Sequence, residues 1–316
     1  MSWFEINSIN YDKKNIKHYK ESIFYENYIN DAKWDILHLS FKDKSLNEII
    51  FLKIFIKKKL FINFLNIPCG FNKSYPNFVY SELIEYLNQK FFGIYVLLVN
   101  NNECQKLSYK KFNYLSFSSI DNLHKELPLD EKNLIYSYSK NWRHNYKRSL
   151  KSNLKFKINN SPNKEEIDEL YSKFQRLKNK KIYSNFSRDL YIYLKYFNDY
   201  IKNYECRLNG KLLAIRTVII INNKAWDLFA LSEDSARKNY ANYYLMHNIF
   251  LNLITKKVKF FDFCGVDIKN NKGFFNFKSG TGCNLLKTNH EYIYSNNTFI
   301  KFFFIIFLFI RRKFYV

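Results

Sequence analysis

Apolar and polar positions alternate most regularly in the second half of the chain. Between Glu131 and Ser152, apolar residues recur at almost every fourth position, a spacing that predicts one helix. Its core face would hold Ile135, Tyr138, Trp142, Tyr146 and Leu150. A strand is predicted over 154–158. Two further helices are expected, one beginning at a capping box of Asn163 and Glu166 and one over 187–198.

A β-hairpin is the strongest short-range signal in the chain. Two strand-like segments, 204–208 and 212–221, flank Asn209-Gly210, a dipeptide typical of a two-residue hairpin turn. A third strand is predicted over 225–231, a helix over 240–256 and a buried strand over 258–263. This order of helices, antiparallel strands, long helix and strand indicates an α+β fold.

The first 130 residues have a less regular pattern. They contain predicted strands over 49–56 and 95–99, part of a helix over 83–87, and a strand end with a loop over 65–70. A chain of 316 residues has room for two domains of about 150 residues each. We therefore predict domains over 1–130 and 131–296, followed by a C-terminal tail over 297–316.

The net charge of +23 suggests a polyanionic partner such as nucleic acid, a phosphorylated substrate or an anionic membrane. Of the 51 basic residues, however, nine are Arg and the other 42 are Lys. Abundant Lys, Asn, Ile, Phe and Tyr are typical of AT-biased codon usage, so the bulk charge is a weaker signal than the positions of the Arg residues. A non-catalytic nucleic-acid-binding protein would explain the charge, but it would not explain the glycine-rich segment described below.

The number and spacing of the Cys and His residues limit which disulfides and metal sites the chain can form. The five Cys residues are odd in number and form no C-x-x-C pair, so we expect no disulfide framework and a cytoplasmic location. The six His residues have no ligand-like spacing, so no metal site is predicted. No basic start followed by an apolar run opens the chain, so no signal peptide is expected.

Four of the seven Gly residues fall in one short stretch, whose backbone must therefore approach other groups closely or adopt unusual angles. The stretch from Phe260 to Tyr294 is FFDFCGVDIKNNKGFFNFKSGTGCNLLKTNHEYIY. It combines an aromatic-Asp-aromatic strand, a loop, the pair Phe277-Lys278 and a glycine-containing turn. This segment resembles the signature of the FemAB family. The basic segment from Asn141 to Arg148 resembles the helix that opens the second domain of that family.

The resemblance covers roughly 130–296 and extends more weakly to the first half. It implies tandem GNAT-like domains, each a mostly antiparallel mixed sheet flanked by helices, with a degenerate N-terminal copy and a groove between the two. Members of the family transfer amino acids from aminoacyl-tRNA to peptidoglycan precursors. Shorter relatives in surface-polysaccharide pathways are taken to be N-acyltransferases. The resemblance places Phe277 and Lys278 at the acyl-transfer site and Gly280 among the substrate-binding residues.

The donor is predicted from the segment ahead of the 240–256 helix. A CoA-dependent GNAT needs small residues there, so that backbone N–H groups can reach the pyrophosphate. Here the segment is Arg237-Lys238-Asn239-Tyr240-Ala241-Asn242, with bulky residues at both positions. The departure favours a donor other than CoA, such as aminoacyl-tRNA. In the alternative, the side chains of Arg237 and Lys238 hold the pyrophosphate of acyl-CoA.

Several other residues have both a functional and a structural interpretation. The basic helix face that includes Arg143 and Arg148 either binds an anionic substrate or is a solvated face. Tyr240 and Tyr243 either stack on a base or sugar or pack internally. Asp262 either acts as a general base or bonds the turn after its strand. Cys264 is not expected to act as a nucleophile, because no His lies near it in sequence.

The tail contains nine uninterrupted apolar residues, too few to span a bilayer, followed by Arg311-Arg312-Lys313. It either inserts into an anionic membrane surface or docks on the N-terminal domain.

The sequence therefore predicts a cytoplasmic acyltransferase, soluble or peripheral on the inner membrane face, without a bound cofactor. It would transfer an aminoacyl or acyl group to an amine of a lipid- or nucleotide-linked cell-envelope glycan precursor. The alternative enzyme is an acyl-CoA-dependent N-acyltransferase acting on an amino sugar. In either case the reaction is expected to be direct attack by the acceptor on a bound ester or thioester.

Overall fold

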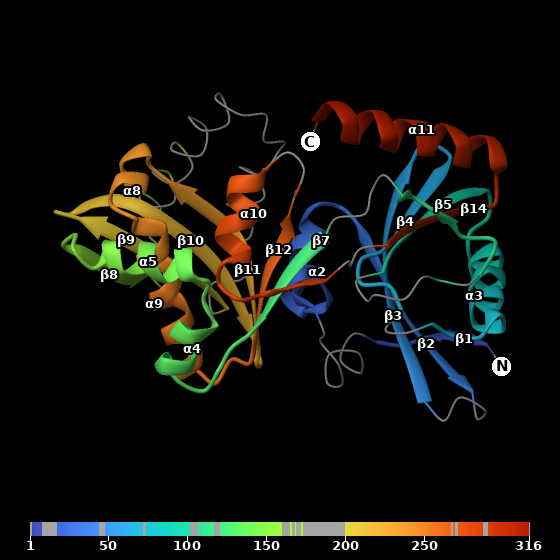
Figure 1. Ribbon diagram of the computed structural model, residues 1–316. Helices are drawn as coiled ribbons and strands as arrows, with labels where there is room; N and C mark the ends of the chain where they lie inside the picture. The colour runs from blue at the N-terminus through green and yellow to red at the C-terminus, as the bar shows by residue number, and fades with distance from the viewer. Residues whose placement is uncertain are drawn as a thin grey trace. The chain divides into compact units, whose positions relative to one another are not determined.

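The computed structural model divides the chain into two compact units (Figure 1). The first unit contains 1–120 together with 287–316, and the second contains 121–286. The structure describes residues 2–7, 18–43, 48–71, 74–101, 107, 109–116, 121–159, 165, 168, 172, 200–266, 268, 271–286 and 290–315. Most of the helix predicted from Asn163, and all of the one predicted over 187–198, lies outside these residues.

The first unit is built on a seven-stranded sheet with the order β1-β2-β3-β4-β5-β14-β6. Among the described residues, neighbouring strands of this sheet run antiparallel, except β4 and β5, which are parallel. The last strand in sequence thus lies inside the sheet, between β5 and β6. The strands are β1 (Trp3–Glu5), β2 (Asp35–Asp43), β3 (Glu48–Lys59), β4 (Ile62–Ile67), β5 (Ile94–Asn101), β6 (Asn113–Tyr114) and β14 (His290–Ser295).

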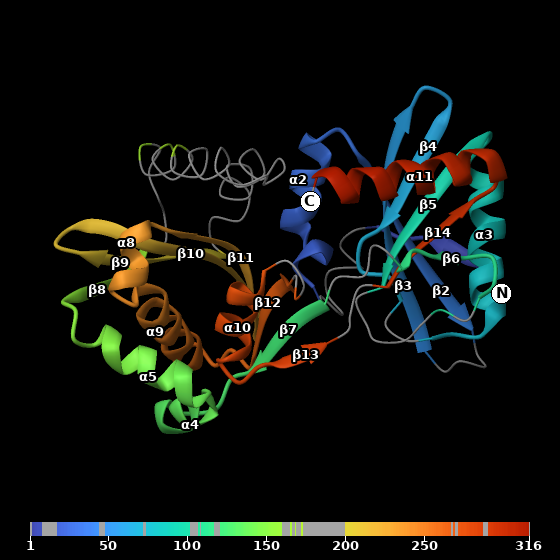
Figure 2. The same ribbon diagram turned by 45° about the horizontal axis from the view of Figure 1, so that its top comes forward.

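Helices cover both faces of this sheet. On one face, α3 (Asn77–Lys90) packs with Val79 and Leu83 in the core. On the other face, α11 (Thr298–Tyr315) buries Leu308 beside Val96 of β5 and Ile293 of β14. This division follows from strand alternation, because Val96 and its neighbours in β5 point to opposite faces. Figure 2 shows α11 running across the strands of the first unit.

A third helical segment, η1 (Tyr19–Glu21) and α2 (Ile23–Asp31), is tied to the first sheet by buried charges. Glu26 of α2 pairs with Lys53 of β3 and lies 2.8 Å from Nε2 of His38 on β2. Burial tends to raise the pKa of Glu26, but the bonds to His38 and Lys53 outweigh it and lower the pKa. These pairs compensate for burying a carboxylate.

The second unit is built on another seven-stranded sheet, with the order β13-β7-β12-β11-β10-β9-β8. Neighbouring strands in the described part of this sheet are again antiparallel, except for the parallel pair β11 and β12. The predicted α+β class with two mostly antiparallel mixed sheets is confirmed. The strands are β7 (Asp121–Glu126), β8 (Leu154–Asn159), β9 (Ile201–Leu208), β10 (Lys211–Ile221), β11 (Lys224–Ser232), β12 (Phe260–Val266) and β13 (Asn284–Leu286).

The predicted hairpin and long helix are both present. Asn209 and Gly210 have φ values of 51° and 80°, as a two-residue turn between β9 and β10 requires. Helix α9 (Ala241–Thr255) packs on one face of the second sheet. The ring of its Phe250 meets Phe261 of β12 edge-on, with centroids 5.3 Å apart.

The single helix predicted over 131–152 is wrong, because two helices stand in its place. Helix α4 (Glu131–Ser137) ends at an extended Tyr138, and α5 (Lys140–Ser149) begins after it. Ser139 caps α5, since its Oγ accepts from the backbone N–H of Trp142 at 3.3 Å. Leu150, expected in the core, is exposed because α5 ends at Ser149. Two short helices of the second unit are α8 (Asp234–Lys238) and α10 (Lys272–Ser279).

The predicted domain boundaries 1–130, 131–296 and 297–316 need correction. Strand β7 precedes the predicted boundary but pairs with β12 in the second sheet. Strand β14 lies within the predicted second domain but pairs with β5 in the first sheet. The tail forms α11, which is docked on the first unit. Within the described residues, no helix combines the length and apolar character needed to cross a membrane.

Candidate functional site

The C-terminal end of β12 has an irregular backbone. The register between β12 and β7 shifts between Asp262 and Gly265, and Cys264 has a φ of 57°. Oδ1 of Asp262 accepts a hydrogen bond of 2.7 Å from the backbone N–H of Cys264. This bond gives Asp262 a structural role, but within β12 and not in a turn after the strand as predicted: the carboxylate holds the irregular backbone between Asp262 and Gly265. Such bulges are frequent beside active sites because they redirect side chains.

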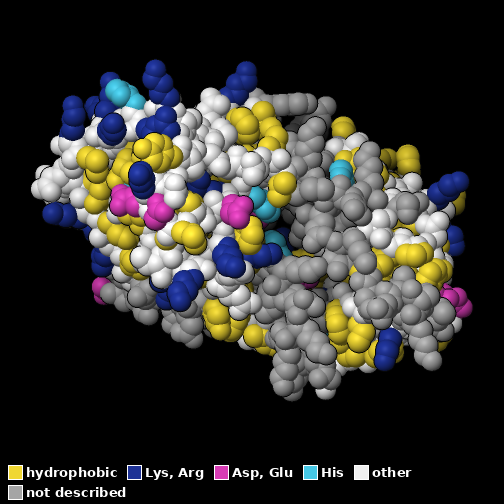
Figure 3. Space-filling model, turned by 60° about the horizontal axis from the view of Figure 1, so that its bottom comes forward, with side chains coloured by type: hydrophobic (Ala, Val, Ile, Leu, Met, Phe, Trp, Pro, Cys, Tyr) yellow, Lys and Arg dark blue, Asp and Glu magenta, His cyan; other side chains and the backbone are white. Residues whose placement is uncertain are grey.

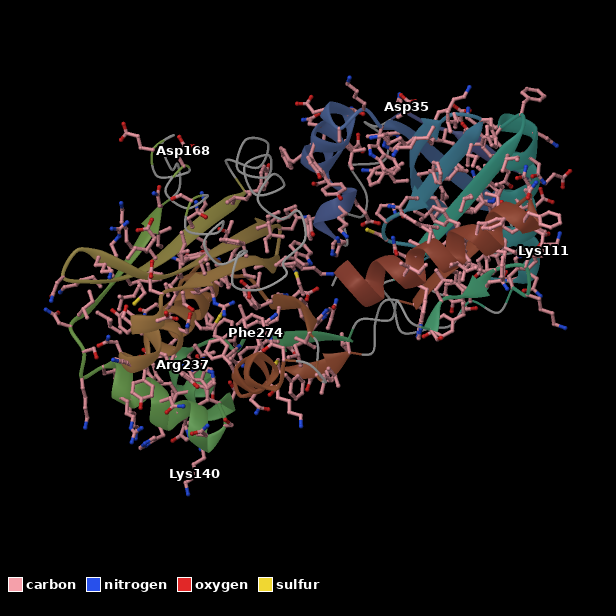
Figure 4. The ribbon with its side chains drawn as sticks, turned by 90° about the horizontal axis from the view of Figure 1, so that it is seen from above. Asp35, Lys111, Lys140, Asp168, Arg237 and Phe274 are labelled. Atoms are coloured by element: carbon pink, nitrogen blue, oxygen red, sulfur yellow. The ribbon has the colours of Figure 1, made fainter. Side chains whose placement is uncertain are left out.

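Helix α10 brings Lys278 to this end of the strand. Its Nζ donates to the carbonyl of Phe263 at 2.7 Å and lies 3.5 Å from the carbonyl of Gly265. The ammonium also lies 4.5 Å from the ring centroid of Phe274, which Figure 4 labels. Burial lowers the pKa of Lys278, while the nearby carboxylates of Asp227 and Asp262 act in the opposite direction. Lys278 is therefore held against the irregular backbone of β12.

A second buried cation lies close to Lys278. Arg216 of β10 forms an ion pair with Asp227 of β11, and both side chains are almost fully buried. Nε of Arg216 and Oδ1 of Asp227 have no hydrogen-bond partner among the described residues. The Arg216 guanidinium also lies 5.4 Å from the ring centroid of Phe277, the residue before Lys278. The predicted pair Phe277-Lys278 thus contacts a polar cluster that retains hydrogen-bonding capacity.

Aromatic contacts connect Phe277 to the start of α9. The ring of Tyr243 meets that of Phe277 edge-on at 5.2 Å and lies 6.3 Å from that of Tyr240. Nη1 of Arg148 on α5 donates to the hydroxyl of Tyr240 at 2.7 Å. The structure therefore brings together five of the predicted site residues: Lys278, Phe277, Tyr243, Tyr240 and Arg148.

The start of α9 is where a CoA pyrophosphate would have to approach. Tyr240 is the N-cap residue with a φ of 54°, and its side chain makes no capping bond. Its ring is held by the Arg148 guanidinium, whose central carbon lies 5.5 Å from the ring centroid. Arg237 and Lys238, on α8, are exposed. A bulky, restrained tyrosine thus occupies a position at which CoA binding is expected to need a small residue.

Arg143 and Gly280 have structural contacts instead of joining this group. Nη1 of Arg143 donates to the carbonyl of Tyr138 at 2.6 Å, at the end of α4. A Cβ added at Gly280 would lie 2.9 Å from Cδ1 of Trp142, so this glycine allows close packing. The exposed residues of α5 include Lys140, Lys147 and Arg148. Figure 3 shows Lys and Arg side chains along the rim of the second unit.

Three polar residues near β12 were not predicted from sequence. Arg216 and Asp227 interrupt apolar strands, a pattern that could have marked them as buried charges with a partner. The third is His124, whose Nε2 lies 3.1 Å from Oδ2 of Asp262. Sequence patterns do not connect His124 with Asp262, because His124 lies far from Asp262 in sequence and before the predicted domain boundary.

Solved structures share this architecture at low sequence identity. The crystal structure of FemX aligns with a TM-score of 0.76 and 11% identity, covering 96% of this chain and 100% of FemX. The chain has the FemX fold. A protein of unknown function from Bacteroides thetaiotaomicron aligns at 0.60 and 11% identity, covering 92% of this chain and 98% of its own. A tandem GNAT protein from the clavulanic acid biosynthesis pathway aligns at 0.51 and 7%, covering 84% of each chain.

The FemX fold confirms, at the level of architecture, the resemblance that the Phe277-Lys278 segment suggested, and the tandem GNAT protein agrees with the two-unit arrangement. No protein-family model matches the chain, and no curated protein sequence matches it.

Proposed function

We propose that this protein is an acyltransferase that passes an aminoacyl group to an amine of a cell-envelope glycan precursor. The observation that carries the proposal is Lys278, held by α10 against the carbonyls of Phe263 and Gly265 within a FemX fold. A preorganised cation in a buried position stabilises the negative charge that develops on a carbonyl oxygen. The acceptor amine attacks the ester carbonyl, and the charge on its oxygen is stabilised as the ester bond breaks.

The donor that fits best is aminoacyl-tRNA. Tyr240 obstructs the approach to the α9 N-terminus that a CoA pyrophosphate requires, and Arg148 restrains the tyrosine. The basic surface of α5 suits a nucleic-acid backbone, because Lys and Arg neutralise phosphates without reading sequence. Tyr243, between Tyr240 and Phe277, offers a ring for stacking on the terminal base or ribose of the donor.

The donor is tested by calorimetry and by transfer. Titration of the protein with CoA at millimolar concentration is expected to give no heat of binding. Labelled aminoacyl-tRNA is expected to donate its amino acid to an amine-bearing, nucleotide-linked muramyl peptide, whereas acetyl-CoA donates nothing. Micromolar affinity for CoA would instead favour the N-acyltransferase that modifies an amino sugar. The acceptor can be replaced by lipid-linked precursors to define its class.

The proposed location is the cytoplasmic face of an anionic membrane, contacted through α11. The helix buries Leu308 on the first unit but exposes several aromatic side chains, with Phe303 64% exposed and Phe302 60% exposed. Arg311, Arg312 and Lys313 follow in the sequence. Each buried aromatic would contribute about 1.5–3 kcal/mol, and each cation near the surface about 1 kcal/mol.

Membrane contact predicts a specific loss on mutation. A protein carrying both Phe302→Ser and Phe303→Ser should sediment with anionic phospholipid vesicles at least tenfold more weakly, because two exposed anchors are removed. Its melting temperature should stay unchanged, because neither side chain belongs to the core. Phe304→Ser is the matched control, since Phe304 packs inward against Phe64 with ring centroids 5.5 Å apart. That control should melt earlier. Equal vesicle affinity for the double variant and the unaltered protein would refute the membrane contact.

A further inference from the structure

We propose that His124 and Asp262 form the general-base pair that removes the proton from the acceptor amine. This inference rests on the proposed acyltransferase function and adds to it a residue outside the FemAB-like signature segment. Lys278 can stabilise charge on the carbonyl oxygen, but an attacking amine must also lose a proton. The pair lies on two adjacent strands of the second sheet.

The pairing of β7 with β12 brings the two side chains together. His124 and Asp262 are directly opposite each other in the antiparallel register, so their side chains emerge on the same face of the sheet. Nε2 of His124 lies 3.1 Å from Oδ2 of Asp262. This distance is short enough for a hydrogen bond, but the angle at the nitrogen does not meet that of a hydrogen bond in the free protein. Catalytic hydrogen bonds are commonly misaligned in free enzymes and tighten when substrate binds.

The carboxylate is held in place and the imidazole is accessible. Oδ1 of Asp262 accepts from the backbone N–H of Cys264, which leaves Oδ2 for His124. The Asp262 side chain is only 11% exposed, whereas that of His124 is 37% exposed. A carboxylate beside Nε2 favours the tautomer with the proton on Nε2, so Nδ1 carries the lone pair of a base. A fixed carboxylate and a reachable imidazole are what general-base catalysis needs.

The His124–Asp262 pair and Lys278 both lie at the same short stretch of the β12 backbone. Lys278 donates to the carbonyl of Phe263, the residue between Asp262 and Cys264. The bulge in β12 lies between Asp262 and Gly265, directly beside the residue opposite His124. A base and an oxyanion-stabilising cation are thereby attached to one irregular strand end, the two functions that acyl transfer to an amine requires.

The proton and bond changes balance without another reactant. As the amine nitrogen attacks, a C–N bond forms, and Nδ1 of His124 takes a proton from that nitrogen. Asp262 stabilises the resulting imidazolium. When the C–O bond to the donor breaks, the imidazolium returns the proton to the departing oxygen of the donor. The products are an amide and a free hydroxyl on the donor, and the neutral histidine is restored.

The test compares two small acceptors with one donor. The unprotonated fraction of each amine is the same for every variant, so the comparison reports on the proton lost after attack. The nitrogen of the ethylamine adduct holds that proton tightly and needs a base, whereas the hydroxylamine adduct is far more acidic and loses it readily. Labelled aminoacyl-tRNA serves as donor, and the rate without protein is subtracted. The unaltered protein should accelerate both reactions. His124→Gln should lose about 10²-fold or more with ethylamine, the usual contribution of a general base, and less than tenfold with hydroxylamine.

Two further variants separate catalysis from structure. Asp262→Asn retains an oxygen for the Cys264 N–H but removes the charge from His124, so it should also lose ethylamine transfer selectively. Glu126→Gln is the matched control, because Glu126 lies two residues along β7 on the same face, is exposed and pairs with Phe260. It should transfer to both acceptors at the unaltered rate.

The outcomes distinguish the acyltransferase proposal from the general-base proposal. No acceleration of either acceptor by the unaltered protein would contradict the acyltransferase proposal itself, and with it the base. Acceleration of both acceptors, with His124→Gln equally active on ethylamine, would overturn the base alone. An equal loss on both acceptors would also overturn it, because the histidine would then be structural. Only a selective loss on ethylamine supports the pair.

Discussion

Replacement of Lys278 by Met is expected to lower the rate of acyl transfer by about 10²–10³-fold, the usual effect of removing one preorganised group that stabilises a developing oxyanion. The ammonium is buried and is bonded to the carbonyl of Phe263, so it is held in place before the reaction begins. Met has a similar length and fills the space beside the Phe274 ring. The measurement is the transfer rate from aminoacyl-tRNA to the muramyl peptide acceptor.

The control for Lys278 comes from the same helix. Lys272 is the first residue of α10 and is exposed, so Lys272→Met should leave the rate unchanged. Circular dichroism of both variants checks folding, because Lys278→Met leaves the Phe263 carbonyl without this donor, at a cost of about 1–3 kcal/mol. Folded Lys278→Met with the unaltered rate would exclude the ammonium from the reaction. If the variant does not fold, Lys278→Arg, which keeps the charge, should recover the fold and part of the rate.

Replacement of Gly282 by Ala should destabilise the second unit by about 3 kcal/mol or more, a cost in the range of severe backbone clashes. Gly282 has a φ of 78°, which itself costs an L-residue about 1–2 kcal/mol. A Cβ there would lie 2.1 Å from the carbonyl oxygen of Ser137, at the end of α4. Because that atom belongs to the backbone, relief requires α4 and the turn after α10 to separate.

Thermal unfolding checks this prediction against a second glycine. A Cβ at Gly273, in α10, would meet nothing within 4 Å. Gly273→Ala should therefore raise stability by up to about 1 kcal/mol, through the better helix propensity of alanine. A Gly282→Ala protein that melts with the unaltered protein would show that the turn is not packed against Ser137.

Local patterns predicted the elements of the second unit well, because they depend on neighbours in sequence. The Asn209-Gly210 turn, the strands on both sides of it and α9 all follow from short-range rules. The break between α4 and α5 was missed because the apolar spacing continues through it. Ser139 caps the second of these helices, and a serine at this position is a sequence signal for the start of a new helix.

The candidate site was predicted only where its residues share one segment. Phe277, Lys278 and Asp262 lie within the signature-like stretch, and Tyr240 lies in the loop where a donor was expected. His124 is brought to Asp262 by pairing between β7 and β12, and Arg216 meets Asp227 across a bulged register. Such contacts depend on which strands are neighbours in the sheet. No periodicity in the chain encodes that order.

The strand order of the first sheet has a consequence for folding on the ribosome. Synthesis proceeds from the N-terminus, and domains fold as their residues emerge. Once residue 286 has left the exit tunnel, the second unit has all of its strands, from β7 to β13. The first unit at that moment lacks β14, which lies between β5 and β6, and α11, which covers Val96. The unit that begins first in this sequence is therefore expected to finish folding after the other, with one face of its sheet exposed to chaperones until α11 has emerged.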